Sequence, residues 1–123
     1  MINTLEQFGR NAGFVWNTLS ENESLPIDEI MKETHLRMYE VEIAIGWLAR
    51  ENKISYHHGR YSIAPTNLTT IIGSNAGIIW HVLNECGTAN VQDIIRESKL
   101  PTQEIYKAIG WFAREEKLSI HLE

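Results

Sequence analysis

The chain has 123 residues, 43% of them hydrophobic, and a formal net charge of −5 at pH 7. This length allows one ordinary domain or two very small ones, and the acidic balance disfavours a strongly electrostatic DNA binder, because that affinity comes from cations facing phosphates. With no apolar run of about 18 residues and no secretory signal, we expect a cytoplasmic protein without membrane contact.

The sequence contains one unit twice. Residues 9–59 align with residues 73–123 at a shift of 64 without a gap, with 21 identities in 51 positions. A repeat of this length holds several elements and enough large apolar residues for its own core, which is typical of a miniature domain. We therefore predict two tandem domains, residues 1–64 and residues 65–123.

Each copy begins with a predicted amphipathic helix. In the segments NAGFVWNTLSE and NAGIIWHVLNE, apolar residues recur at i, i+3, i+4 and i+7. This spacing puts Trp16 and Trp80 on the inward stripe, so both are expected in the core. The helices start near Asn3 and Asn67, which are acceptable N-caps.

A short extended stretch and two further helices follow in each copy. The extended stretches are residues 25–27 and 89–91, and the second helices open at Asp28 and Gln92. The third helices run from about Met38 to Asn52 and from Thr102 to Glu116. The turn before the third helix contains His35 and Lys99, where a glycine is usual.

The first copy ends in a predicted β-hairpin. Period-two alternation on both sides of His58 and Gly59 indicates two strands with a tight turn, and Pro65 marks the linker. The second copy reads KLSIHLE and has only the first strand. Because an unpaired strand edge tends to pair, we predict that it pairs with the first domain or forms a homodimer through the C-terminal strand edge.

This order of elements is that of a winged helix-turn-helix domain. The segments NAGFVW, EVEIAIGWLARENKI, SYHHGRYSI, NAGIIW and EIYKAIGWFAREEKL resemble a small bacterial winged helix-turn-helix family of unknown function. The resemblance implies a mainly helical α+β fold with three helices and a small β-sheet or wing in each copy, the second wing truncated. For activity it implies a nucleic-acid or regulatory role.

The third helices carry a Gly-Trp step in both copies. A glycine inside a helix costs about 1 kcal/mol relative to alanine, so Gly46 and Gly110 are predicted to allow a close approach of backbones. The neighbour is either within the domain or on a partner. Trp47 and Trp111 lie at the boundary of the apolar face, and three roles are open to them: covering the edge of the core, packing against the wing, or anchoring an interface, for which tryptophan is enriched.

DNA contacts are predicted at the third helix of the second copy and at the first wing, because a helix-turn-helix reader places its third helix in the major groove. A basic hairpin tip is able to track a phosphate backbone. The candidate DNA-binding residues are His58, Arg60, Tyr61, Thr102, Gln103, Tyr106, Lys107 and Arg114. The candidate residues for a protein interface are Ile43, Trp47, Arg50 and Trp111.

No residue pattern predicts catalysis, a cofactor or a metal site. Cys86 is the only cysteine, which excludes an internal disulfide and a cysteine-based zinc site. His57 and His58 are adjacent and point to opposite faces of a strand. We expect no enzymatic activity and consider two functions: a DNA-binding transcriptional regulator that contacts double-stranded DNA, and a protein-interaction adaptor that uses the winged-helix surfaces without binding DNA.

Overall fold

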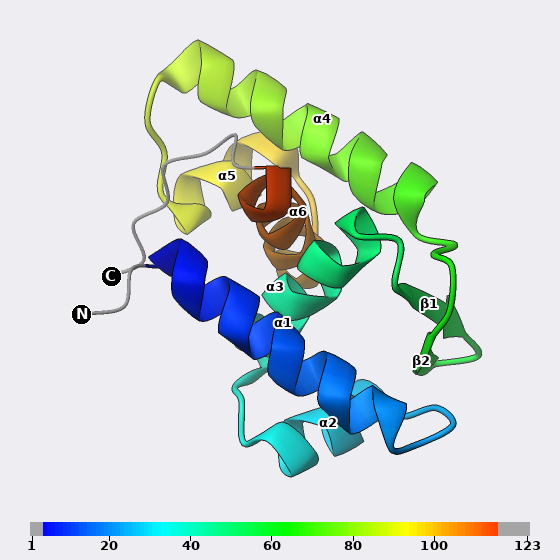
Figure 1. Ribbon diagram of the computed structural model, residues 1–123. Helices are drawn as coiled ribbons and strands as arrows, with labels where there is room; N and C mark the ends of the chain where they lie inside the picture. Colours follow the sequence, from blue (N-terminus) through cyan, green and yellow to red (C-terminus); the bar gives the residue numbers. More distant parts are fainter. Residues whose placement is uncertain (1–3, 116–123) are drawn as a thin grey trace.

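The computed structural model describes residues 4–115 (Figure 1). Its elements follow the predicted order, with three helices and a hairpin in the first copy and three helices in the second. They are α1 Thr4–Ser20, α2 Ile27–Thr34, α3 Met38–Arg50, β1 Ile54–His57, β2 Arg60–Ile63, α4 Thr69–Cys86, α5 Val91–Ser98 and α6 Thr102–Glu115. The mainly helical α+β fold is confirmed, while the predicted last strand and its homodimer edge lie outside the described residues.

The hairpin forms where the sequence predicts it. β1 and β2 pair antiparallel with Tyr56 opposite Tyr61, and Leu25 of the extended stretch adds a single bridge to Tyr61. The two turn residues, His58 and Gly59, have positive φ angles of 52° and 79°. This conformation matches the right-handed twist of the strands and favours a two-residue turn with glycine in second place.

The linker between the two copies is fastened to the wing. Asn67 accepts a hydrogen bond from the Tyr56 backbone N–H at 2.9 Å and donates one to the Tyr56 carbonyl at 2.7 Å. Asn52 accepts the N–H of Thr66 at 2.8 Å. The prediction that Asn67 caps the following helix is wrong, since Leu68 occupies the N-cap. Asn67 instead fixes the path of the linker.

The two copies pack directly on each other, with α3 and α6 crossing at the centre and α1 and α4 on the outside (Figure 1). Each hydrophobic core borrows residues from the other copy. Phe8 and Ile43 join the core of the second copy, whereas Leu68 and Ile72 join that of the first. Phe8 and Ile72 are equivalent in the repeat, so the exchange is reciprocal. The boundary between residues 64 and 65 as a division into separate domains stays a prediction.

Candidate functional site

The two third helices meet at their glycines. A Cβ atom added to Gly46 would collide with the carbonyl oxygen of Lys107 and lie 2.7 Å from its carbonyl carbon. A Cβ atom added to Gly110 would collide in the same way with the carbonyl group of Ile43. The sequence left open which backbone approaches these two glycines. The structure shows that it is the backbone of the other copy of the repeat. The glycines allow α3 and α6 to touch backbone to backbone.

Charged side chains flank this crossing in a reciprocal pattern. Arg50 forms an ion pair with Glu115 at 3.0 Å, and the equivalent Arg114 pairs with Glu51 at 2.9 Å. Each guanidinium also lies over a tryptophan of the opposite helix, Arg50 at 5.5 Å from the ring centre of Trp111 and Arg114 at 5.8 Å from that of Trp47. The stacking adds a cation–π attraction to each pair. The equivalent residues Arg50 and Arg114 thus each contact the third helix of the other copy.

A buried charged pair breaks this symmetry. Glu42 Oε2 lies 3.3 Å from Lys107 Nζ, which also pairs with Glu104 at 3.2 Å. Within residues 4–115, no donor is aligned for a hydrogen bond to Glu42 Oε2. The repeat places Tyr106 where the first copy has Glu42 and Lys107 where it has Ile43. The crossing therefore joins two chemically different helices.

The pKa values of Glu42 and Lys107 are both raised in this pair. Desolvation raises the pKa of Glu42, and the nearby Lys107 charge lowers it by a smaller amount. Desolvation alone would lower the pKa of Lys107, but the combined effect of Tyr61, Glu42 and Glu104 outweighs it and raises that pKa. The Lys107 ammonium is thus held charged inside the contact between the copies.

The predicted DNA-binding residues of α6 are divided by this contact. Lys107 has only 14% of its side chain exposed and is engaged by carboxylates. Tyr106 is half-buried and packs on Tyr39 with ring centres 5.5 Å apart. Arg114 is paired with Glu51, as above. Thr102 and Gln103 are exposed at the start of α6, and Arg114 is also exposed although it is paired.

The predicted wing residues are likewise split. Tyr61 is 5% exposed and lies in the first core, so its expected place at an exposed tip is wrong. Arg60 is exposed, and its guanidinium donates hydrogen bonds to the side-chain and backbone oxygens of Ser24, both at 2.8 Å. His58 is exposed at the turn. The wing thus presents two exposed histidines, His57 and His58, and an arginine already held by a loop.

The four predicted interface residues all lie at the contact between the copies. Ile43 is 1% exposed and belongs to the core of the second copy, while Trp47 and Trp111 pack against both cores. Arg50 reaches Glu115 and Trp111 of α6. The structure brings these residues together inside the chain.

The sequence of residues 3–64, and again that of residues 68–123, matches a family described as "Winged helix-turn-helix domain (DUF2582)". The chain belongs to this family, as a tandem repeat. No curated protein and no solved structure matches it. The fold is one that DNA-binding proteins use, with one helix presented to the major groove. At that coarse level, family membership supports a DNA-binding role.

Within this winged helix-turn-helix repeat, the outer faces of α1 and α4 are the surfaces that the sequence predictions missed. Trp16 and Trp80, predicted to be core residues, are 37% and 46% exposed, so that prediction is wrong. Phe14 is 51% exposed and its equivalent Ile78 is 43% exposed. The sequence carries one signal for this surface, because the same tryptophan occurs in both copies, as Trp16 and Trp80. The helical period favoured an inward position because the apolar stripe is wider than the buried face.

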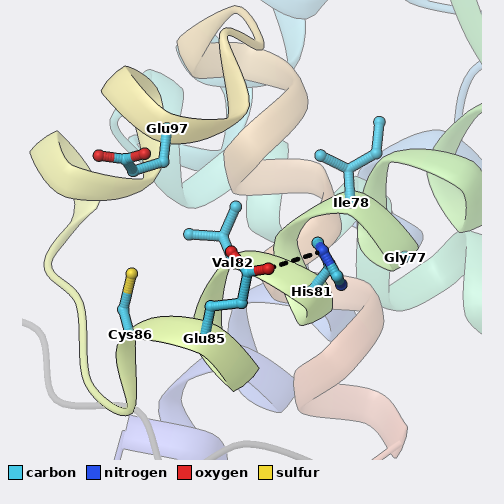
Figure 2. A pocket seen from close by; sticks show the side chains of 7 residues that line it. All are labelled: Gly77, Ile78, His81, Val82, Glu85, Cys86 and Glu97. Carbon is cyan, nitrogen blue, oxygen red and sulfur yellow. Dashed lines mark ion pairs between the residues drawn. The ribbon is translucent and has the colours of Figure 1, made fainter.

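No group of His, Cys, Asp and Glu side chains within residues 4–115 is suited to hold a metal ion. A groove of about 380 Å³ lies beside α4 (Figure 2). Within residues 4–115, no helix has the length and apolar character needed to cross a membrane.

Proposed function

We propose that this protein is a non-enzymatic protein-interaction adaptor, in which two winged-helix repeats form one platform and the outer faces of α1 and α4 contact partners. The observation that carries the proposal is the packing of α3 on α6. In a DNA reader the third helix must enter the major groove. Here the middle of each third helix is covered by the other.

The charges support the same choice. A continuous positive strip through Arg60, Lys107 and Arg114 would favour DNA. Instead, Lys107 and Arg114 are paired with carboxylates and Arg60 is held by Ser24. Phosphate affinity requires a cluster of cations that are free to displace counterions. The net charge of −5 adds long-range repulsion of a polyanion.

The outer faces have the composition of contact surfaces. Interfaces are enriched in aromatic residues and depleted of charged ones at their centre, and tryptophan dominates binding hot spots. Between residues 69 and 86, α4 carries one charged residue, Glu85, and exposes Ile71, Ile78 and Trp80. Trp16 and Phe14 of α1 provide the equivalent surface. An apolar surface of this kind on an otherwise charged protein favours a partner.

A DNA-binding transcriptional regulator is the second candidate, and family membership favours it. Its contacts would be Thr102 and Gln103 at the start of α6, together with His58 and Arg60 on the wing. The first residues of a recognition helix are those that meet base edges. These four residues are exposed.

A titration of labelled random duplex DNA with protein at low salt, measured by fluorescence anisotropy, distinguishes the two functions. For an adaptor we expect no binding at about 50 µM protein, because even non-specific DNA binders associate in that range. Micromolar binding that weakens in Arg60→Ala and Gln103→Ala would instead support the regulator.

The adaptor is tested directly by affinity capture with matched baits. The wild-type protein is compared with a Trp16→Ser, Trp80→Ser double variant whose helical circular dichroism is unchanged. We expect proteins that the wild type retains and the double variant loses. Equal capture by both baits would contradict the assignment of the outer faces.

A further inference from the structure

The groove beside α4 combines apolar, small and acidic residues on one surface. It lies between α4 and the end of α5, with Glu97 contributed by α5 and the other lining residues by α4 (Figure 2). Its lining residues are Gly77, Ile78, His81, Val82, Glu85, Cys86 and Glu97. Among the described residues, no lysine or arginine lines it.

The geometry points to this groove as the docking site of a cationic amphipathic helix from a partner protein. The inference rests on the adaptor function proposed above and names the chemistry of its partner. In this mode the apolar face of a helix lies in a groove and is anchored by residues spaced three or four apart. Ile78 and Val82 offer an apolar floor for such anchors.

The glycine in the groove packs closely against no other part of residues 4–115. A Cβ atom added to Gly77 would meet nothing within 4 Å, whereas the helix loses stability by keeping glycine there. Gly13 is the equivalent residue of α1, and its Cβ position is equally open. Close approach of an outside backbone gives both glycines a function.

The charges of the groove select a cationic partner. The Glu85 carboxylate lies 3.1 Å from His81 Nε2, and the Glu97 carboxylate lies 3.4 Å from Arg96 Nε. The Arg96 guanidinium also pairs with the Asp93 carboxylate at 3.0 Å. The three acids outnumber the two basic side chains, Arg96 and His81, and so leave a local excess of negative charge. A second copy of this acidic chain would be repelled there, whereas lysine or arginine side chains would be attracted.

Comparison of the two copies of the repeat supports the acidic rim as a retained feature. Glu85 and Glu97 correspond to Glu21 and Glu33, which are also exposed glutamates. Cys86, on the same rim, corresponds to Asn22. The carboxylates persist where neighbouring groove residues have changed, and packing of the core does not require them.

The single cysteine allows a direct test in the full chain. Cys86 is exposed and lines the groove, so a docked helix should slow its alkylation by a thiol reagent. The probe is a synthetic helical peptide with leucines on one face and lysines on the other. The control peptide keeps the leucines and replaces every lysine by glutamate. We expect the lysine peptide to slow alkylation about tenfold at saturation and the glutamate peptide to leave it unchanged.

Three variants locate the effect. Gly77→Leu places an apolar side chain in the groove, at a position where the Cβ atom meets no described neighbour within 4 Å, and should abolish protection. A Glu85→Gln, Glu97→Gln double variant should raise the peptide Kd about tenfold, which corresponds to the loss of about 1.4 kcal/mol. The matched Glu21→Gln, Glu33→Gln variant should leave protection of Cys86 unchanged.

The inference is overturned if both peptides protect equally, or if protection survives Gly77→Leu. Failure of the adaptor function has a different signature, since it consists of duplex DNA binding in the anisotropy titration. An absence of protection together with an absence of DNA binding would reject this groove and leave the exposed tryptophan faces as the adaptor surface.

Discussion

Gly46 of α3 and Gly110 of α6 are equivalent residues of the two copies, and each lacks the Cβ atom that the opposing helix backbone would exclude. Gly46 faces the Lys107 carbonyl group and Gly110 faces that of Ile43. The lost helix propensity is offset by the packing of two helices at backbone contact. This crossing holds the two winged-helix repeats together.

We expect Gly46→Ala to destabilise the protein although alanine favours helix. The new methyl group would collide with backbone atoms, which cannot rotate away as a side chain can, so α3 and α6 must separate. Overpacking typically costs about 1–3 kcal/mol, and the gain in helix propensity returns about 1 kcal/mol at most. Urea unfolding followed by circular dichroism measures the difference.

Gly77→Ala is the matched control. It is also a helix-interior glycine, but its Cβ position is open, so alanine should stabilise the protein by about 0.5–1 kcal/mol. Destabilisation by both substitutions would show that the helices do not tolerate alanine for some reason other than the crossing.

The Glu42–Lys107 pair predicts a strongly non-additive double mutant. Lys107→Met alone leaves Glu42, whose side chain is 3% exposed, without a counter-charge and should cost about 3 kcal/mol. Replacing both residues by methionine removes the buried charge as well, so the double variant is expected within about 1 kcal/mol of wild type. A double-mutant cycle from denaturant unfolding gives the coupling energy. Additive losses would contradict the pairing.

The elements of this fold could be predicted from sequence because each has a local cause. Helical periodicity marks α1 and α3, and the His58–Gly59 pair marks the hairpin turn. The assembly could not be predicted, because the burial of Glu42 and Lys107 depends on a helix 64 residues away in the repeat. Helix periodicity indicates the face of each third helix that is covered by its own copy's core. It does not indicate the second face, which is covered by the α3–α6 contact.

The turn residues His35 and Lys99 provide a further prediction. Both have φ of 61°, in the left-handed region, and each N–H donates a bond to a carbonyl at the end of the preceding helix. A residue with a Cβ atom is destabilised there by about 1–2 kcal/mol relative to glycine. We expect His35→Gly and Lys99→Gly each to stabilise the protein by about 0.5–1 kcal/mol after the loss from unfolded-state entropy. His35→Ala should not stabilise it, and thermal unfolding distinguishes the two.

Tyr61 makes the stability of the protein fall in alkaline solution. Burial raises its pKa from 10.0 to about 12, more than the neighbouring Lys107 charge lowers it. Between these values the unfolded chain loses the phenolic proton while the folded chain keeps it. Stability is therefore fully present below pH 10 and declines as the pH rises towards about 12, by roughly 2–3 kcal/mol for this group.

Lys107 acts in the same direction, because its raised pKa keeps a proton in the folded state that the unfolded chain releases above its ordinary value of 10.5. Urea unfolding across this alkaline range should show the decline, and Tyr61→Phe should flatten the part that belongs to the phenol. An equally steep decline in Tyr61→Phe would assign the whole effect to Lys107. A stability that rises with pH in wild type would contradict the burial of both groups, since only a lowered pKa could produce it.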